Sequence, residues 1–221
     1  MDIRNLTLGD GIPKICVSLT GDTRESIIAE AEGLMFRKPD IVEWRFDMAN
    51  EYDYPIVENI LMNIRAILAE IPLIFTFRTL REGGKRTISD ESYMRLYDIV
   101  ASSGLVDIMD IEGLGNKEVA KAVIKKVKSH GIKTIISYHD FDKTPDNEEL
   151  KIILKELDEL DGDIVKLAVM PKNNDDVKRI IGVSSEFHNE NPDRIIITMS
   201  MGEMGSASRL AGFYDGSSVT F

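Results

Sequence analysis

The 221-residue chain has one cysteine, three histidines and no long apolar run. The single cysteine, Cys16, excludes an internal disulfide and makes a reducing cytoplasm the expected compartment. No window approaches the roughly 18 consecutive apolar residues of a membrane span. Residues 1–14 also lack an apolar run of signal-peptide length. The sequence therefore predicts a cytoplasmic protein with no membrane partner.

Positive charge is scarce as well. Lysine and arginine number 27 against 38 aspartates and glutamates, which leaves a net charge of -11 and a pI near 4.8. Because this surplus of negative charge repels phosphates, neither nucleic acid nor an anionic membrane is an expected partner. Three scattered histidines and one cysteine make no ligand cluster, so no metal site is expected.

What the chain does contain is a regular alternation of strand and helix patterns. Strand-like stretches begin roughly every 25 to 32 residues, a spacing typical of βα units in a parallel sheet. The expected strands are 14–19, 41–47, 73–78, 105–112, 133–139, 164–170, 194–200 and 217–221, and the expected helices are 23–36, 54–70, 90–102, 117–130, 147–160, 175–187 and 208–213. Eight strands with seven helices predict a single (β/α)8 TIM barrel domain over residues 1–221, preceded by a short hairpin near residues 5–11. An open doubly wound sheet is the alternative, and its dinucleotide-binding version is disfavoured because no glycine-rich fingerprint follows the first strand.

The expected strands have one polar face. Successive side chains of a strand point to opposite faces, and the outer face of a barrel must be apolar to pack on helices. The polar face therefore lines the lumen, and its charged residues lie towards the carboxyl ends of the strands, where barrel active sites lie. These residues are Glu43, Arg45, Arg78, Asp110, Glu112, His139 and Lys166. The same alternation assigns Cys16, Ser18, Thr198 and Ser200 to the lumen.

Lys166 is the one charged residue in the apolar stretch Ile164–Met170. Burial disfavours the charged form of lysine, so its pKa falls, and a neutral amine attacks carbonyls to form a Schiff base. Two structural interpretations stand beside this one: the ammonium group extends to the strand end, or it pairs with a carboxylate. His139 favours imine chemistry, because a protonated imine acidifies the neighbouring carbon and histidine is the usual base for such a step.

Other polar residues have expected roles in the same chemistry. A carboxylate such as Glu82 or Asp110 is expected to orient the imidazole. Arg209, which follows the loop 202–208, is expected to bind a substrate carboxylate in a bidentate manner. Arg45 and Arg78 are expected to bind hydroxyl groups or the same anion.

From about Lys14 to Phe221 the chain resembles the type I 3-dehydroquinate dehydratases of the shikimate pathway. Each motif is weak alone, but the set is highly specific in this order. The motifs are Glu43-Trp44-Arg45-x-Asp47, Phe75-Thr76-Phe77-Arg78 with Glu82-Gly83-Gly84, Ser137-Tyr138-His139-Asp140-Phe141, Lys166-Leu167-Ala168-Val169-Met170-Pro171, and Met199-Ser200-Met201 leading to Ser208-Arg209-Leu210.

The resemblance implies a reaction and a set of site residues. Lys166 is then the Schiff-base lysine that attacks the C3 ketone of 3-dehydroquinate, and His139 removes a C2 proton and helps the C1 hydroxyl leave as water. Glu82 and Asp110 are then the carboxylates that position the histidine, and Arg209 binds the substrate carboxylate. Further substrate contacts are implied for Ser18, Glu43, Arg45 and Arg78. The resemblance also implies no metal, no organic cofactor and a homodimer.

The family pattern continues beyond Phe221 into a loop and a final helix that help to cover the site, and this chain ends before them. We therefore expect a barrel without its last helix, with lower stability and much weaker activity than a full-length relative. Two other functions stay open. A Schiff-base class I aldolase would act on sugar phosphates, and a lid-less, non-catalytic barrel would bind dehydroquinate without turnover. The sequence also leaves open a biosynthetic or a catabolic role.

Overall fold

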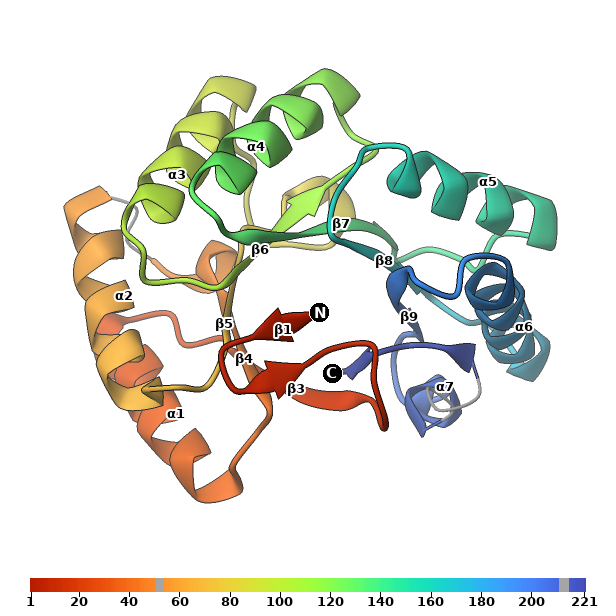
Figure 1. Ribbon diagram of the computed structural model, residues 1–221, viewed down its shortest axis with the longest axis horizontal. Coiled ribbons are helices and arrows are strands. Elements are labelled where there is room, and N and C mark those ends of the chain that lie inside the picture. The colour runs from red at the N-terminus through yellow and green to blue at the C-terminus, as the bar shows by residue number, and fades with distance from the viewer. Residues whose placement is uncertain (51–53, 211–214) are drawn as a thin grey trace.

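The computed structural model describes residues 1–50, 54–210 and 215–221. Its main sheet holds eight parallel strands in the order β10-β3-β4-β5-β6-β7-β8-β9. A parallel bridge between Ile196 and Ser217 joins the two ends of this order, so the predicted barrel is confirmed (Figure 1). The strands are β3 (Lys14–Leu19), β4 (Ile41–Arg45), β5 (Leu73–Thr76), β6 (Ile108–Glu112), β7 (Lys133–Asp140), β8 (Ile164–Val169), β9 (Ile195–Ser200) and β10 (Val219–Thr220).

Helices surround the strands, from α1 round to α7 (Figure 1). In the described ranges they are α1 (Arg24–Arg37), α2 (Tyr54–Leu68), α3 (Asp90–Ser102), α4 (Lys117–Ser129), α5 (Asn147–Asp158), α6 (Asn174–Glu190) and α7 (Ser206–Leu210), with short 3-10 helices η1 (Phe46–Met48) and η2 (Leu80–Glu82). Most begin after a short polar residue whose side chain accepts a hydrogen bond from a free backbone N–H of the first turn. These N-cap residues are Thr23, Ser89, Asn116, Asp146 and Asn173. No helix in the described part of the chain is long and apolar enough to cross a membrane.

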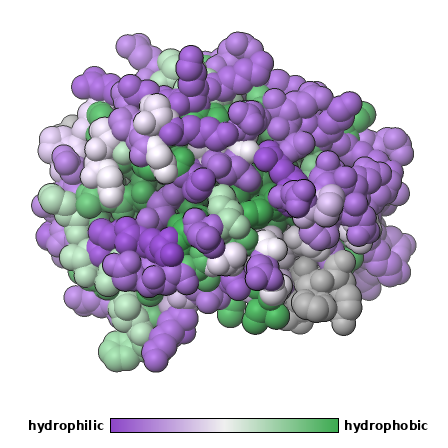
Figure 2. Space-filling model, viewed as in Figure 1, coloured by the Kyte–Doolittle hydropathy of each residue, from purple (hydrophilic) through white to green (hydrophobic). Residues whose placement is uncertain are grey.

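The lumen has two layers. Its lower part, towards the amino ends of the strands, is apolar. It is built mainly from one isoleucine near the start of each of six strands, namely Ile41, Ile74, Ile108, Ile135, Ile164 and Ile197. Ile3 and Leu8, from the N-terminal hairpin β1 (Asp2–Ile3) and β2 (Leu6–Thr7), pack against this layer. Figure 2, seen from the hairpin side, shows a mainly hydrophilic face with hydrophobic side chains gathered around the centre. The lumen is therefore polar only towards the carboxyl ends of the strands.

Alternation misplaced two of the expected lumen residues. Thr198 faces outward, because its hydroxyl oxygen lies 2.6 Å from that of Ser184 in α6, and Ser200 shares its side of β9. Ile197 and Met199 occupy the lumen instead. Burial of the Thr198 hydroxyl behind the strand is possible here because Ser184 of α6 supplies a hydrogen-bond partner.

Several element ends also differ from the expected ones. The strand expected to reach residue 47 ends at Arg45, because the chain turns into η1. The strand expected to reach Arg78 ends at Thr76. The hairpin turns at residues 4–5, where Arg4 has a positive φ of 51°, and not at the glycines of 9–11. Residues 211–213 of the last expected helix lie outside the described residues.

Asp107 fastens the hairpin to the barrel. Its carboxylate accepts hydrogen bonds from Arg4 Nε (2.6 Å), Arg65 Nη2 (2.6 Å) and Leu73 N (2.8 Å). We expect Asp107→Ala to lower the free energy of unfolding by about 2 kcal/mol, because half-buried donors lose their partner. Urea unfolding measures the change, with Glu70→Ala as control, since Glu70 pairs with Arg4 from a mostly exposed position. Equal midpoints for the two variants would contradict this role for Asp107.

Candidate active site

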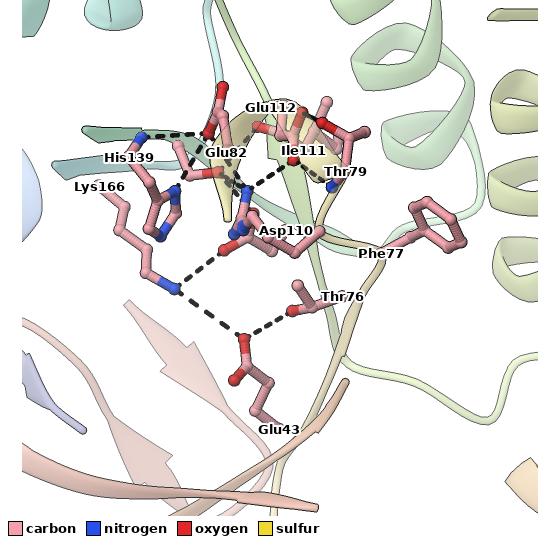
Figure 3. Close-up of polar contacts among 12 residues, drawn as sticks. Glu43, Thr76, Phe77, Thr79, Glu82, Asp110, Ile111, Glu112, His139 and Lys166 are labelled. Carbon is pink, nitrogen blue, oxygen red and sulfur yellow. Dashed lines mark hydrogen bonds and ion pairs between the residues drawn. The ribbon is translucent and has the colours of Figure 1, made fainter. Parts of the chain in front are cut away.

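Lys166 lies in the middle of β8, and its side chain is buried in the lumen. Its ammonium nitrogen donates to Asp110 Oδ2 (3.0 Å) and lies 3.9 Å from Glu43 Oε1 (Figure 3). The ring of Phe221 lies against the same ammonium, 4.2 Å from nitrogen to ring centroid. Of the two structural interpretations, carboxylate pairing is therefore the one observed. Because these contacts fix the ammonium, Lys166 presents one defined nitrogen to the site.

Glu43 continues this polar layer on the other side of the lumen. Ser18 Oγ donates to Glu43 Oε2 (2.6 Å), and Thr76 Oγ1 donates to Glu43 Oε1 (2.7 Å). Strand register explains the contact with Ser18, since Ser18 of β3 lies directly beside Glu43 of β4. A buried carboxylate needs such donors to offset its lost hydration. The structure therefore brings Ser18 and Glu43 together, and Thr76 of β5 holds the second carboxylate oxygen of Glu43.

Arg78 joins the Asp110 carboxylate of β6 to the Ser137 hydroxyl of β7. Its Nη2 donates to Asp110 Oδ1 (2.7 Å) and its Nη1 donates to Ser137 Oγ (2.9 Å), while Ser137 Oγ donates to Asp110 Oδ1 (2.6 Å). Burial alone would raise the pKa of Asp110, but the charges of Arg78 and Lys166 outweigh it and hold that pKa well below its usual range. Asp110 is therefore ionised and gives Lys166 a fixed counter-charge.

His139 is held by Glu82. One carboxylate oxygen, Glu82 Oε2, accepts from the backbone N–H of His139 (3.1 Å) and lies 3.1 Å from its Nδ1. Figure 3 shows the imidazole between Glu82 and the Lys166 ammonium. An ionised Glu82 can only accept, so it selects the tautomer with the proton on Nδ1 and leaves the Nε2 lone pair free as a base.

Burial and nearby charges set the protonation of this pair. Burial, followed by the charges of Arg78 and Lys166, lowers the pKa of His139 well below its usual value, so the imidazole is neutral near pH 7. Burial, followed by the charge of Glu112, raises the pKa of Glu82 to about 8. The free protein thus combines a neutral imidazole with a carboxyl group that ionises near pH 8.

The remaining two arginines take different positions. Arg45 donates through Nε and Nη2 to both carboxylate oxygens of Asp47 (2.8 and 2.9 Å), at the upper end of β4. Arg209 of α7 donates to the carbonyl oxygens of Ser200 (3.3 Å) and Gly202 (3.1 Å). Arg209 therefore lies at the rim that follows β9, with its guanidinium bound by backbone oxygens and by no carboxylate among the described residues.

The structure groups the predicted residues in two sets. Glu82 lies against His139, and Asp110 lies against Lys166 and Arg78, with no direct hydrogen bond to His139 in the described residues. Sequence reasoning gave no role to Thr79 or Phe221. Phe221 had a usable signal, because it shares its side of the last strand with Val219, which packs in the lumen. Thr79 had none, since it follows the end of β5, where alternation no longer applies.

In the described residues, no group of three or more His, Cys, Asp or Glu side chains is arranged to hold a metal ion. The site instead contains an amine, a neutral imidazole and fixed carboxylate and guanidinium charges. These groups can form an imine with a ketone, move a proton at the adjacent carbon and bind an anion with hydroxyl groups.

Comparison with known proteins identifies the family that this chain matches. The model of the type I 3-dehydroquinase family matches residues 15–221. A 3-dehydroquinate dehydratase of Clostridioides difficile (strain 630) is 41% identical over 222 residues, covering 100% of this chain and 87% of that protein. A 3-dehydroquinate dehydratase of Bacillus licheniformis is 42% identical over 220 residues, covering 99% and 87%.

Solved structures agree. The structure of 3-dehydroquinate dehydratase from Enterococcus faecalis matches with a TM-score of 0.96 at 37% identity and covers 100% of this chain and 92% of that chain. A type I 3-dehydroquinate dehydratase from Clostridium difficile, solved with covalently modified comenic acid, matches with a TM-score of 0.96 at 41% identity. It covers 100% of this chain and 87% of that chain.

Proposed function

Because the chain belongs to the type I 3-dehydroquinase family, we propose that it dehydrates 3-dehydroquinate to 3-dehydroshikimate through a Schiff base on Lys166. Such an enzyme is a hydro-lyase of the shikimate pathway. One observation carries the proposal: two pairs, Lys166 with Asp110 and His139 with Glu82, share the upper lumen. The first pair supplies an amine for a ketone, and the second supplies a base beside it.

The first step is imine formation. The Lys166 ammonium gives up one proton, and the neutral amine attacks the C3 carbonyl carbon to form a C–N bond. The carbonyl oxygen leaves as water after it has taken up that proton and one from the attacking nitrogen. The product is a protonated imine. Its positive charge takes the place of the ammonium charge that the free protein sets between Asp110 and Glu43. These carboxylates are thus arranged to stabilise the cation before substrate binds.

The second step is proton transfer. The Nε2 lone pair of His139 takes a proton from C2. The electron pair of that C–H bond forms a C2–C3 double bond while the π pair of the imine moves to nitrogen, which gives an enamine. The enamine then expels the C1 hydroxyl, to which His139 returns the proton, so that water leaves and a C1–C2 double bond forms. Hydrolysis of the imine releases the product and regenerates Lys166. Glu82 keeps the imidazole in the tautomer that this step requires.

Substrate contacts follow from the charged and hydroxyl groups around the pair. Arg209 is proposed to bind the substrate carboxylate, because its guanidinium is at the rim and has no carboxylate partner among the described residues. Arg45, Glu43 and Ser18 are proposed to bind substrate hydroxyls. Arg78 holds Asp110 and reaches the same layer. The chemistry needs no metal or organic cofactor.

By the same family resemblance, the proposal includes a homodimer and a cytoplasmic location. Cys16 is buried in the apolar part of the lumen as a free thiol, which suits a reducing compartment. Light scattering during gel filtration tests the dimer directly.

The test of the function is turnover. Incubation with 3-dehydroquinate should produce a conjugated enone, which is followed by its ultraviolet absorbance, and a chelator should leave the rate unchanged. A sugar phosphate should give no product, which separates the dehydratase from an aldolase. Folded protein that binds 3-dehydroquinate without forming the enone would contradict the proposal and favour a non-catalytic binding role.

A further inference from the structure

Glu112 is a buried carboxylate to which the proposed chemistry gives no role. It ends β6, two residues after Asp110, and its exposed fraction is 5%. A buried charge is retained only where it is paired and hydrogen-bonded. The groups that neutralise and hydrogen-bond the Glu112 carboxylate come from one short segment.

Each partner of the Glu112 carboxylate lies between residues 78 and 81. Glu112 Oε1 accepts from Thr79 N (2.6 Å) and from Arg78 Nη1 (3.4 Å). Glu112 Oε2 accepts from Thr79 Oγ1 (2.7 Å) and from Arg81 Nη2 (3.4 Å). This segment connects β5 to η2, and Glu82 is the last residue of η2. Glu112 therefore fastens, from the neighbouring strand, the segment from which Glu82 reaches His139.

Thr79 connects Glu112 to the turn that carries Glu82. Its carbonyl oxygen accepts from Glu82 N (3.0 Å) and from Gly84 N (2.8 Å), so the turn that presents Glu82 is built on Thr79. Arg78 provides a second connection, since its Nη1 lies 3.5 Å from Glu82 Oε2 and 3.4 Å from Glu112 Oε1. Figure 3 shows Glu112 and Thr79 on one side of Glu82 and His139 on the other.

We propose that Glu112 is a positioning residue for proton transfer: through Thr79 and Arg78 it holds Glu82 against His139. It touches no reacting atom. The inference rests on the proposed function, because it assigns Glu112 to the step that His139 performs.

The charge of Glu112 also affects the pKa of Glu82, which an uncharged side chain of the same shape would not do. The charged and titratable groups that face Glu82 are Arg78, two residues after β5, Arg81 in η2, Asp110 and Glu112 in β6, and Tyr138 and His139 in β7. Among their charges, that of Glu112 contributes most to raising the pKa of Glu82. Glu82 must be ionised to accept the Nδ1 proton of His139, so kcat/KM should rise with pH as Glu82 ionises, near pH 8. Removal of the Glu112 charge should move this rise to lower pH.

Glu112→Gln is the first test. Glutamine keeps the shape, and its one oxygen can still accept from Thr79 N and Arg78 Nη1, which share Glu112 Oε1. It loses the charge and the acceptor for Arg81 Nη2. We expect kcat to fall about tenfold, the scale of one lost hydrogen bond to a charged group, with KM little changed. The rise of kcat/KM should move to lower pH. Glu118→Gln, an exposed glutamate at the start of α4, is the matched control and should keep both the rate and the profile.

Two further variants separate position from charge. Glu112→Asp keeps the charge but shortens the reach, so kcat should stay low while the pH profile returns to that of the unchanged protein. Thr79→Val removes only the hydroxyl contact, so kcat should fall less than in Glu112→Gln, with no shift of the profile. Thr79→Val also keeps the test available should Glu112→Gln fold poorly, which a thermal melt reports.

The outcomes are distinguishable from those of the proposed function. If the unchanged protein dehydrates 3-dehydroquinate while Glu112→Gln keeps its kcat and pH profile, the role of Glu112 is wrong and the function stands. A profile shift of the same size in Glu118→Gln would also overturn the inference, because it would be a general effect of net charge. Absence of turnover in the unchanged protein would instead overturn the proposed function.

Discussion

Replacing Lys166 by methionine is expected to lower kcat by about four orders of magnitude or more, the scale on which loss of a covalent nucleophile lowers turnover. Methionine has a similar length but no amine, so no imine can form and borohydride should trap nothing. Substrate binding is expected to weaken less than turnover, because the proposed arginine contacts remain. Steady-state rates and intact mass after borohydride treatment measure both effects.

Controls are needed because Lys166 also neutralises buried carboxylates. Loss of its charge leaves Asp110 and Glu43 with fewer partners, so Lys166→Met is expected to be less stable as well. Lys166→Arg keeps the charge but supplies a guanidinium that does not attack ketones, so it should fold better and stay inactive. Lys155→Met, at a mostly exposed lysine of α5, should keep full activity. Substantial turnover in Lys166→Arg would contradict a nucleophilic role for this lysine.

Replacing His139 by asparagine is expected to lower kcat by about 10²- to 10⁴-fold, the usual contribution of a positioned acid–base group. Imine formation is a separate step, so the substrate should still attach to Lys166 and then stall. The variant should therefore accumulate a borohydride-trappable adduct while it turns over slowly. Mass spectrometry of the trapped protein, together with kcat, distinguishes this result from a simple loss of binding.

His130 provides the matched control. It caps the end of α4, is partly exposed and lies 3.4 Å from Asp98, before the amino end of β7, whereas His139 is near the carboxyl end of that strand. His130→Asn should keep the rate and the trapping behaviour of the unchanged protein. A His139→Asn variant with nearly unchanged kcat would show that another group removes the C2 proton.

The barrel was predictable because its periodicity depends on residue type alone. Most expected strands and helices begin within a few residues of the observed ones, as at β3 and α3. The errors occur where contacts between different elements determine which way a side chain faces. Thr198 faces α6 because Ser184 offers a hydroxyl there, which alternation along one strand cannot reveal. The isoleucine layer was not predicted. Its isoleucines lie on the same strand faces as the charged residues, and those faces were interpreted as polar along their whole length.

The sequence named side chains that the structure brings together, but it could not say which of them pair. Strand parity and the family motifs together named Lys166, His139, Glu82 and Asp110, but parity alone cannot say which carboxylate meets which cation. In the structure Asp110 pairs with Lys166, while Glu82 pairs with His139. These pairings depend on barrel closure and on the turn after β5, where Glu82 leaves the strand pattern.

The central claim is that Lys166 forms a Schiff base with 3-dehydroquinate, and borohydride trapping of the unchanged protein tests it most directly. The protein is incubated with 3-dehydroquinate, reduced, weighed intact and mapped by peptides. The account predicts one stable adduct per chain, located on Lys166. Folded protein that dehydrates 3-dehydroquinate yet gives no adduct, or gives it on another lysine, would contradict the account.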